Sequence, residues 1–342
     1  MPEPVEPTPV APAGDTMTTP ATASPPPYGA HGAATATAAA GGVAPAALVE
    51  PVDAAPAVEV AGTRKLGLVG WLSLTWMTVL LLAVIFAPAL PLDDPDESFL
   101  EIVRKGPIQP GHVFGGDGNG RDMLARVIYG ARTSLLISVS AVLIAFVLGG
   151  ILGLIAGYAR GKIDTVLSTA FNVILSIPSL VLVLSFVAVF ASSDQETSNA
   201  KLMTVLILAI SLVSVPLIAR ITRASTMAWS EREFVRAAEV LGGRHSRIVF
   251  REVLPNVLPA MASIALLGIG LAVVAEGGLA LLGASVVEVP SWGNMIALGR
   301  PDLARAPHIV AIPSVAIFFT ILSLNVLGDV VRARFDVRES VL

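Results

Sequence analysis

Long apolar segments alternate with shorter polar stretches over most of the chain. Each segment reaches about 20 residues, enough for a helix rising about 1.5 Å per residue to cross a hydrocarbon core about 30 Å thick. The pattern predicts an all-α polytopic membrane protein with six transmembrane helices, at residues 66–90, 135–158, 166–191, 202–221, 257–283 and 309–331. An even number of spans puts both chain ends on the same side of the membrane.

One polar, charged stretch, residues 229–256, interrupts the apolar pattern between the fourth and fifth segments, and we call it the elbow. Apolar residues at three- and four-residue spacing predict a helix with one small, flat stripe, formed by Phe234, Ala237, Ala238 and Leu241. Gly242 and Gly243 fit a helix C-terminus, and Pro255 can begin the next helix because its missing amide needs no partner there. The elbow therefore predicts a helix, a turn, a second helix and a new membrane span.

Composition supports a membrane protein. Hydrophobic residues make up 54% of the chain and charged residues 14%, and the mean hydropathy is +0.77, too apolar for an ordinary soluble domain. The net charge of -4 says little about partners. The absence of cysteine excludes disulfides, thiolate metal sites and cysteine nucleophiles. The four histidines are scattered and show no spacing typical of metal ligands.

Residues 1–62 differ from the rest of the chain. They are rich in Pro, Ala and Thr and contain few large apolar side chains, so they cannot bury enough surface to offset the entropy of ordering. We expect a disordered cytoplasmic tail. A signal peptide is disfavoured because the first apolar run begins only after Arg64 and Lys65 and is long enough to span the membrane.

Basic residues set the expected orientation. Lys and Arg gather on one face of the predicted topology, at Arg64, Lys65, Arg160, Lys162, residues 220–251, Arg332, Arg334 and Arg338. This face should be cytoplasmic by the positive-inside rule, and the elbow and both termini lie on it. The opposite loops hold acidic residues such as Asp93 and Asp96 but also four basic ones, so the bias is clear without being complete.

Small residues and prolines inside the spans predict packing and bends. Gly149, Gly153 and Gly157 recur every fourth residue, which allows another helix to approach closely. Pro178 and Pro216 lie inside the third and fourth segments, where each removes a backbone hydrogen bond and kinks the helix. Either proline could form a fixed kink or a moving hinge.

Glu276 is the one acidic residue deep in a predicted span, where an ionisable group needs a partner or a wet cavity. Two readings stay open. Glu276 bonds to neighbouring backbone loosened by Gly277 and Gly278, or it faces a translocation path and contacts a charged end of the substrate.

The loop between the first two spans is rich in glycine, which permits tight turns, and Asp122 can cap the helix leading into the second span. Asp117, Asn119 and Asp122 suggest a calcium loop, but Arg121 occupies a position where an oxygen ligand is needed. We therefore predict no metal site in the chain.

Four stretches carry a resemblance to a known family. The elbow, with Ala237-Ala238, three further residues, Gly242 and later Leu254-Pro255, resembles the cytoplasmic EAA loop of ABC importer permeases. Residues 114–135, 290–295 and 324–329 are similar, in the same order, to signatures of the C-type permeases for dipeptides and oligopeptides. The resemblance covers about residues 66–338. Departures are Gly116 in place of Thr, Glu252 in place of His, and Gly277-Gly278 in place of two alanines.

The resemblance implies a type I ABC importer permease fold and a function in peptide translocation across the cytoplasmic membrane. The corresponding organisation is a tail at residues 1–62, a first transmembrane helix at 63–92, an extracytoplasmic loop at 93–134, and a permease core at 135–338 that contains the elbow. The protein would be multi-pass, with both termini cytoplasmic.

Partners and cofactors also follow from the resemblance. It implies a second homologous permease subunit, two cytoplasmic ATPase subunits or one fused ATPase, an extracytoplasmic substrate-binding protein and the lipid bilayer, with no nucleic acid. The chain itself would need no cofactor, because ATP and Mg²⁺ would bind the ATPase. The resemblance assigns docking on the ATPase to Glu233, Phe234, Arg236, Ala237, Ala238, Leu241, Gly242, Arg244 and Arg247.

No enzyme signature emerges from the sequence. The nearest match to a phosphate-binding P-loop, residues 157–162, has three residues between its glycines instead of four and is followed by Ile163. An ion-coupled secondary transporter is the main alternative, but Glu276 is the only acid available inside a span. A permease for another solute such as nickel, and a membrane scaffold that uses the elbow for docking, also remain open.

Overall fold

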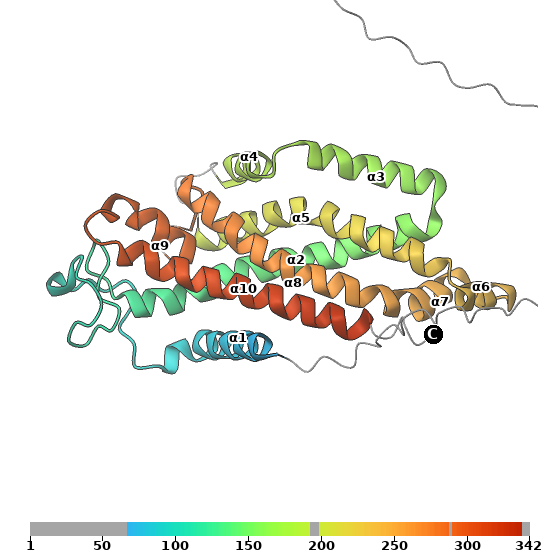
Figure 1. The fold of residues 1–342 in the computed structure, drawn as a ribbon. Coiled ribbons are helices and arrows are strands. Elements are labelled where there is room, and N and C mark those ends of the chain that lie inside the picture. The colour runs from blue at the N-terminus through green and yellow to red at the C-terminus, as the bar shows by residue number, and fades with distance from the viewer. Residues whose placement is uncertain (1–66, 192–197, 287–288, 337–342) are drawn as a thin grey trace, which may run out of the picture. The chain divides into compact units, whose positions relative to one another are not determined.

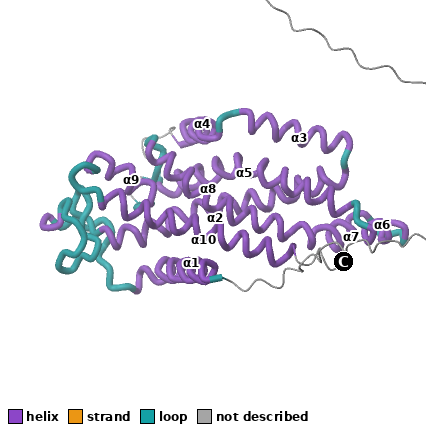
Figure 2. The backbone as a smooth tube through the Cα atoms, viewed as in Figure 1, coloured by secondary structure: helices purple, strands orange, loops and turns teal. Residues whose placement is uncertain are grey.

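The computed structural model describes residues 67–191, 198–286 and 289–336, so the predicted tail at residues 1–62 lies outside the described residues. Within these ranges the regular structure is entirely helical (Figures 1 and 2). The long helices are α1 (Leu68–Phe86), α2 (Met123–Ala159), α3 (Gly161–Ser176), α4 (Ser179–Ala191), α5 (Asn199–Ser230), α8 (Leu254–Leu281) and α10 (His308–Asp336). The shorter ones are η1 (Ala87–Ala89), η2 (Leu100–Ile102), α6 (Glu233–Val240), α7 (His245–Ile248), η3 (Val249–Val253), α9 (Trp292–Gly299) and η4 (Arg300–Asp302).

Five helical stretches of the described chain are long and apolar enough to cross a membrane, and a sixth crossing requires the bent pair α3 and α4. The third apolar segment is therefore not one straight helix, which confirms the predicted bend at Pro178. Its two helices meet at 85°. Pro178 explains the break, because a proline has no amide to donate and keeps the residue before it out of the helical region. Ile177 accordingly has ψ 130°, whereas α5 continues through Pro216 as a single helix.

Three spans extend well beyond their apolar segments, and one of them, the stretch His245–Leu281, begins inside the elbow. The helix α2 begins at Met123 and not near residue 135, and α5 continues to Ser230 beyond the predicted end at residue 221. Asp122 caps α2 as predicted, because its Oδ1 accepts a hydrogen bond from the Ala125 amide at 2.8 Å. A helix can continue beyond the membrane into water when its end is capped. The length of the apolar segment therefore underestimates the length of the helix.

The helices α2 and α5 pack closely along the small-residue stripe. A Cβ atom added to Gly149, Gly153 or Gly157 would lie only 2.5–2.7 Å from a backbone carbonyl oxygen of α5, at Val215, Ala219 and Arg223 respectively. Real Cβ atoms do not approach oxygen so closely. The prediction that this stripe serves helix packing is confirmed.

Three buried clusters hold the elements together. One joins α2, α4, α5 and α8, and includes Ile137, Val183, Leu206 and Leu279. A second joins the N-terminal end of α2 to α9 and α10 around Trp292. The third lies under the elbow and comprises Val235, Ile248, Val253, Val257 and Met261.

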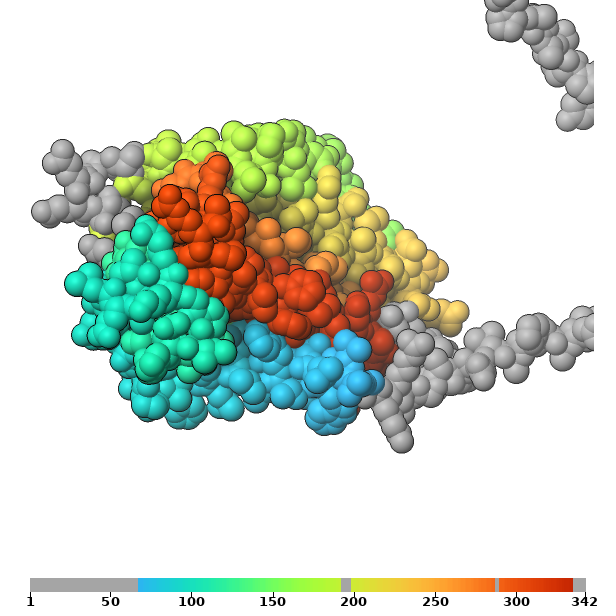
Figure 3. Space-filling model, turned by 60° about the vertical axis from the view of Figure 1, so that its left-hand side comes forward, coloured from blue at the N-terminus to red at the C-terminus, as the bar shows by residue number. Residues whose placement is uncertain are grey.

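The long loop between α1 and α2 packs against the C-terminal elements, as Figure 3 shows. Arg104 Nε donates to Asp302 Oδ1 at 2.6 Å, and the His308 ring lies 3.1 Å from the Gly116 carbonyl oxygen. Gly115 and Gly120 have φ +74° and +81°, which confirms that glycines form tight turns here. The loop lies at the opposite end of the helices from α6 and α7 (Figure 1).

Candidate functional site

The elbow forms a short amphipathic helix with one face on the protein and one face exposed. Val235 is fully buried in the cluster under the elbow, while Phe234 is 39% exposed and Leu241 87% exposed. Three residues of the predicted stripe, Phe234, Ala237 and Leu241, are thus exposed, whereas Ala238 is half-buried and packs against the cluster. Val240, also 87% exposed, extends the apolar surface.

The ends of α6 are fixed by local geometry. The Arg232 guanidinium stacks over the Trp229 ring at 5.3 Å, next to the N-terminus of the helix. At the C-terminus Gly242 has φ +77°, and the Gly243 amide donates to the Ala238 carbonyl at 3.0 Å. This pattern is a Schellman motif, which confirms the predicted role of the two glycines. The helices α7 and η3 follow, and Pro255 lies in the first turn of α8 as predicted.

All nine residues assigned to ATPase docking lie together on the elbow. Glu233, Phe234, Arg236, Ala237, Leu241, Gly242, Arg244 and Arg247 are exposed, and Ala238 is half-buried. Their exposure makes them available to a partner, and their docking role stays a prediction. Phe250, 67% exposed on η3, adds an apolar residue that the sequence reasoning did not include.

The end of α2 is bonded to both helices of the elbow. Tyr158 Oη donates to Glu239 Oε1 on α6 at 3.3 Å and lies 3.0 Å from His245 Nδ1 on α7. Nearby, Arg160 Nη2 donates to Glu231 Oε1 at 3.0 Å. Sequence reasoning missed Tyr158 because it is simply the last residue of an apolar segment, with no local sign of a distant partner.

The basic end of α5 holds α3 in place. The Arg223 guanidinium binds both carboxylate oxygens of Asp164, with Nη2 at 2.7 Å from Oδ2. One turn earlier, Arg220 Nη2 donates to Asn172 Oδ1 at 2.6 Å. Two arginines that the sequence analysis used only to assign orientation therefore also position the broken span.

Glu276 is 3% exposed and lies in a network of polar groups from three elements. Ser291 Oγ donates to its Oε1 at 2.7 Å and Ser134 Oγ to its Oε2 at 3.1 Å, and the Gly293 amide also donates to it. The partners therefore belong to α2 and to the start of α9, and not to the neighbouring Gly277 and Gly278. The suggestion that Glu276 lines a translocation path stays a prediction.

The glycines beside Glu276 permit a close approach of α9. A Cβ atom added to Gly293 would lie 2.7 Å from the Gly277 Cα. On its own, the sequence Pro290-Ser291-Trp292 is typical of a turn with a tryptophan at the membrane interface. Instead Trp292 is fully buried at the start of α9, where its Nε1 donates to the Val127 carbonyl at 2.9 Å.

A small polar cavity of about 150 Å³ lies between α9 and the loop that joins α1 to α2, which we call the outer loop after its expected orientation. Its charged lining comprises Arg104, Asp117, Arg126 and Asp302. Arg126 is 2% exposed and donates to the Pro95 carbonyl at 2.9 Å. The opposite charges of the lining largely pair with each other, so this cavity mainly anchors the loop.

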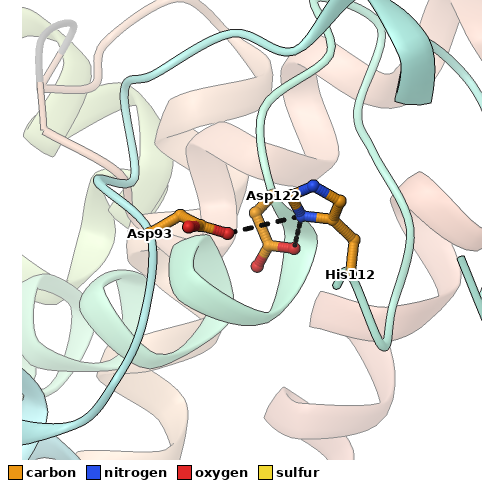
Figure 4. Close-up of side chains that lie close together, drawn as sticks. All are labelled: Asp93, His112 and Asp122. Atoms are coloured by element: carbon orange, nitrogen blue, oxygen red, sulfur yellow. Dashed lines mark hydrogen bonds and ion pairs between the residues drawn. The ribbon is translucent and has the colours of Figure 1, made fainter. Parts of the chain in front are cut away.

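Three further side chains converge elsewhere on the outer loop (Figure 4). His112 Nδ1 lies 2.9 Å from Asp122 Oδ2 and 3.4 Å from Asp93 Oδ2. The calcium loop considered from the sequence shares Asp122 with this group. Its other acid is engaged elsewhere, because Asp117 Oδ1 accepts the amides of Asn119 and Arg121 at 2.8 and 2.9 Å. Sequence reasoning missed the three-residue group because its members are far apart along the chain.

Comparison with known proteins identifies the chain. A family model described as "Binding-protein-dependent transport system inner membrane component" matches residues 149–341. The chain belongs to this permease family. The matched region includes the elbow, Glu276 and the last two spans, so the resemblance inferred from four short stretches is confirmed.

Curated relatives of this permease cover most of it. A dipeptide transport system permease protein from Alkalihalophilus pseudofirmus is 35% identical over 80% of this chain and 86% of its own length. A di/tripeptide permease from Pseudomonas aeruginosa is 32% identical over 77% of this chain and 86% of its own. A glutathione permease from Pectobacterium atrosepticum is 30% identical over 75% of this chain and 83% of its own.

Solved structures confirm the permease fold. An inward-facing conformation of the MetNI methionine ABC transporter superposes with a TM-score of 0.53 at 19% identity, over 62% of this chain and 97% of the other. A second crystal form of the same transporter gives 0.51 at 18% identity and the same coverage. The chain is thus an all-α, multi-pass membrane permease with the type I importer fold.

Proposed function

We propose that this permease is the membrane-spanning subunit of an ATP-driven ABC importer that moves dipeptides or oligopeptides across the cytoplasmic membrane. The observation that carries the proposal is the elbow, whose apolar stripe is exposed at one end of the membrane helices. Peptide cargo is supported by the names of the relatives, which are permeases for dipeptides, di/tripeptides and glutathione.

The elbow would be the docking site for an ATPase subunit. Phe234 and Leu241 would enter an apolar groove on the ATPase, and the charged residues around them, Glu233, Arg236, Arg244 and Arg247, would fix the register. Movement of the ATPase pair on ATP binding would then displace α6 and α7 together, because both bond to Tyr158. The displacement would reach α2 directly and α8 through the cluster under the elbow.

ATP and Mg²⁺ would bind separate ATPase subunits or one fused ATPase, and this chain would carry no cofactor. A second homologous permease would complete the pore, and an extracytoplasmic binding protein would deliver the cargo. The basic end with the elbow and both termini would face the cytoplasm, and the loop between α1 and α2 would face outward.

The ATPase interaction can be tested with two matched leucines. Leu241 on the elbow is 87% exposed and Leu100 on the outer loop is 89% exposed, so neither supports the core. We expect Leu241→Asp to abolish co-purification of the ATPase and ATP-driven uptake of a labelled dipeptide in vesicles. Leu100→Asp should leave ATPase capture unchanged.

Equal ATPase capture by both variants would contradict the proposal, as would uptake that persists in vesicles without the ATPase. The second result would favour an ion-coupled transporter. If the assembled importer takes up Ni²⁺ but not dipeptides, the ABC mechanism would still hold, but the proposed peptide cargo would be wrong.

A further inference from the structure

Asp93, His112 and Asp122 bring three possible metal ligands to one point on the outer loop (Figure 4). Asp93 follows α1, His112 lies in the middle of the loop, and Asp122 is the capping residue of α2. One ligand atom from each lies within 4.8 Å of the other two. The group therefore joins the two ends of the loop to its middle.

In the part of the chain that the structure describes, the carboxylates of this group have no arginine as an ion-pair partner, unlike those of Asp96 and Asp117 on the same loop. Asp96 faces Arg121 and Arg126, and Asp117 also pairs with Arg126. Among the described residues, the ion-pair partner of Asp93 and of Asp122 is His112. Two carboxylates thus share one imidazole as their polar partner.

A single imidazole nitrogen cannot donate a full hydrogen bond to each of two carboxylates. The Nδ1 atom carries at most one hydrogen, yet an oxygen from each carboxylate approaches it, at 2.9 and 3.4 Å. A divalent cation in place of that hydrogen would accept a lone pair from the nitrogen and from both oxygens, and it would neutralise both carboxylates. We propose that Asp93, His112 and Asp122 bind a divalent transition-metal ion such as Zn²⁺.

Two of the three distances between ligand atoms are close to those around such an ion. Zinc binds nitrogen and oxygen ligands at about 2.0–2.2 Å in a tetrahedron, which places neighbouring ligand atoms about 3.3 Å apart. The distance from His112 Nδ1 to Asp93 Oδ2 already matches at 3.4 Å, and the distance to Asp122 Oδ2 needs to open slightly from 2.9 Å. The mixed nitrogen and oxygen ligands favour a transition metal over calcium, which prefers oxygen alone.

The surroundings hold two ligands firmly and leave one side open. Asp122 Oδ1 is fixed by the Ala125 amide, and the His112 ring lies against the Phe99 ring at a centroid distance of 4.8 Å. The Asp122 and His112 side chains are 5% and 13% exposed, while that of Asp93 is 43% exposed. Water can therefore complete the coordination on the side of Asp93.

The bound ion would clamp the loop between the end of α1 and the start of α2. This site lies far from the elbow along α2, and its existence does not depend on the proposed transport function.

The test uses the full chain in detergent, purified without a polyhistidine tag, treated with a chelator and titrated with Zn²⁺ by calorimetry. We expect one Zn²⁺ per chain, with affinity weakened at least about tenfold in Asp93→Asn and in His112→Ala. Asp94→Asn is the matched control, because Asp94 is the exposed neighbour of Asp93, and its affinity should be unchanged. Addition of Co²⁺ should give the visible absorption of a tetrahedral complex, and Asp93→Asn should remove it.

Asp93→Asn keeps the proposal testable if His112→Ala fails to fold, because Asp93 lies on the exposed side of the group. Absence of saturable Zn²⁺ binding up to millimolar concentrations would overturn the proposal and leave an ion-paired histidine. Equal affinity in the unmodified chain, Asp93→Asn and Asp94→Asn would overturn it as well.

Discussion

Tyr158 is the residue that connects α2 to both helices of the elbow. Its hydroxyl meets Glu239 on α6 and His245 on α7, so one side chain of α2 contacts both helices of the elbow. The Tyr158 and His245 rings also meet edge to face, with centroids 5.9 Å apart. The tyrosine thus keeps α6 and α7 in a fixed position relative to α2.

Removal of the Tyr158 hydroxyl should weaken coupling without loss of the fold. The two hydrogen bonds contribute about 0.5–1.5 kcal/mol each, so we expect Tyr158→Phe to lower the ratio of peptide transported to ATP hydrolysed by between about 5- and 150-fold. The measurement is uptake and phosphate release in the same proteoliposomes. The control Tyr129→Phe alters a tyrosine at the other end of α2 and should leave the ratio unchanged. A Tyr158→Phe ratio equal to that of the unmodified protein would show that the contact is not part of the coupling.

At the scale of single elements, short sequence motifs correctly predicted the helix caps and the helix break, because adjacent residues determine these features. The Schellman motif at Gly242, the cap at Asp122 and the break at Pro178 all follow from the backbone preferences of a few adjacent residues. The second face of α6 was not predicted, because Val235 is buried by residues that follow later in the chain. A periodic stripe shows which residues share a face, but it does not show whether that face meets the protein or a partner.

Packing of α2 on α5 gives the sharpest prediction at this scale. A Cβ atom at Gly153 would lie 2.5 Å from the Ala219 carbonyl oxygen, whereas one at Gly268 would meet the nearest atom, on Val142, at an ordinary 3.6 Å. We expect Gly153→Ala to destabilise the protein by about 1–3 kcal/mol, because it forces two helices apart. Gly268→Ala, a matched glycine inside a span, should change stability little. Apparent melting temperatures of the two variants in detergent test this, and equal temperatures would contradict the packing described here.

At the scale of the whole described chain, five of the six predicted spans and their order are found, because the length of a membrane-crossing helix follows from the thickness of the bilayer. The third predicted span is instead a bent pair of helices. The family signatures also pointed to the correct permease family. The sequence could not show that Glu276 bonds to Ser134 and Ser291, or that Asp93 meets His112, since both depend on residues far apart in the chain. Long-range contacts of this kind arise from the packing of several helices at once.

The helix α2 connects the two proposed sites. It begins at the Asp122 cap beside the candidate metal group and ends next to Tyr158 under the elbow. The outer loop and the elbow therefore lie at opposite ends of one continuous helix (Figure 1). In this arrangement, an inward displacement of the elbow acts on the same helix that carries the outer loop.

The central claim is that the elbow lies in the cytoplasm in contact with an ATPase. The chain contains no cysteine, so a single Leu241→Cys substitution on this surface gives one reactive thiol. The most direct measurement is the labelling of that thiol in intact cells by a membrane-impermeant reagent, followed by crosslinking in membranes that contain the assembled importer. We predict no labelling from outside and a crosslink to the ATPase, with Leu100→Cys showing the reverse. Labelling of Leu241→Cys from outside, or the absence of any crosslink to the ATPase, would contradict the account.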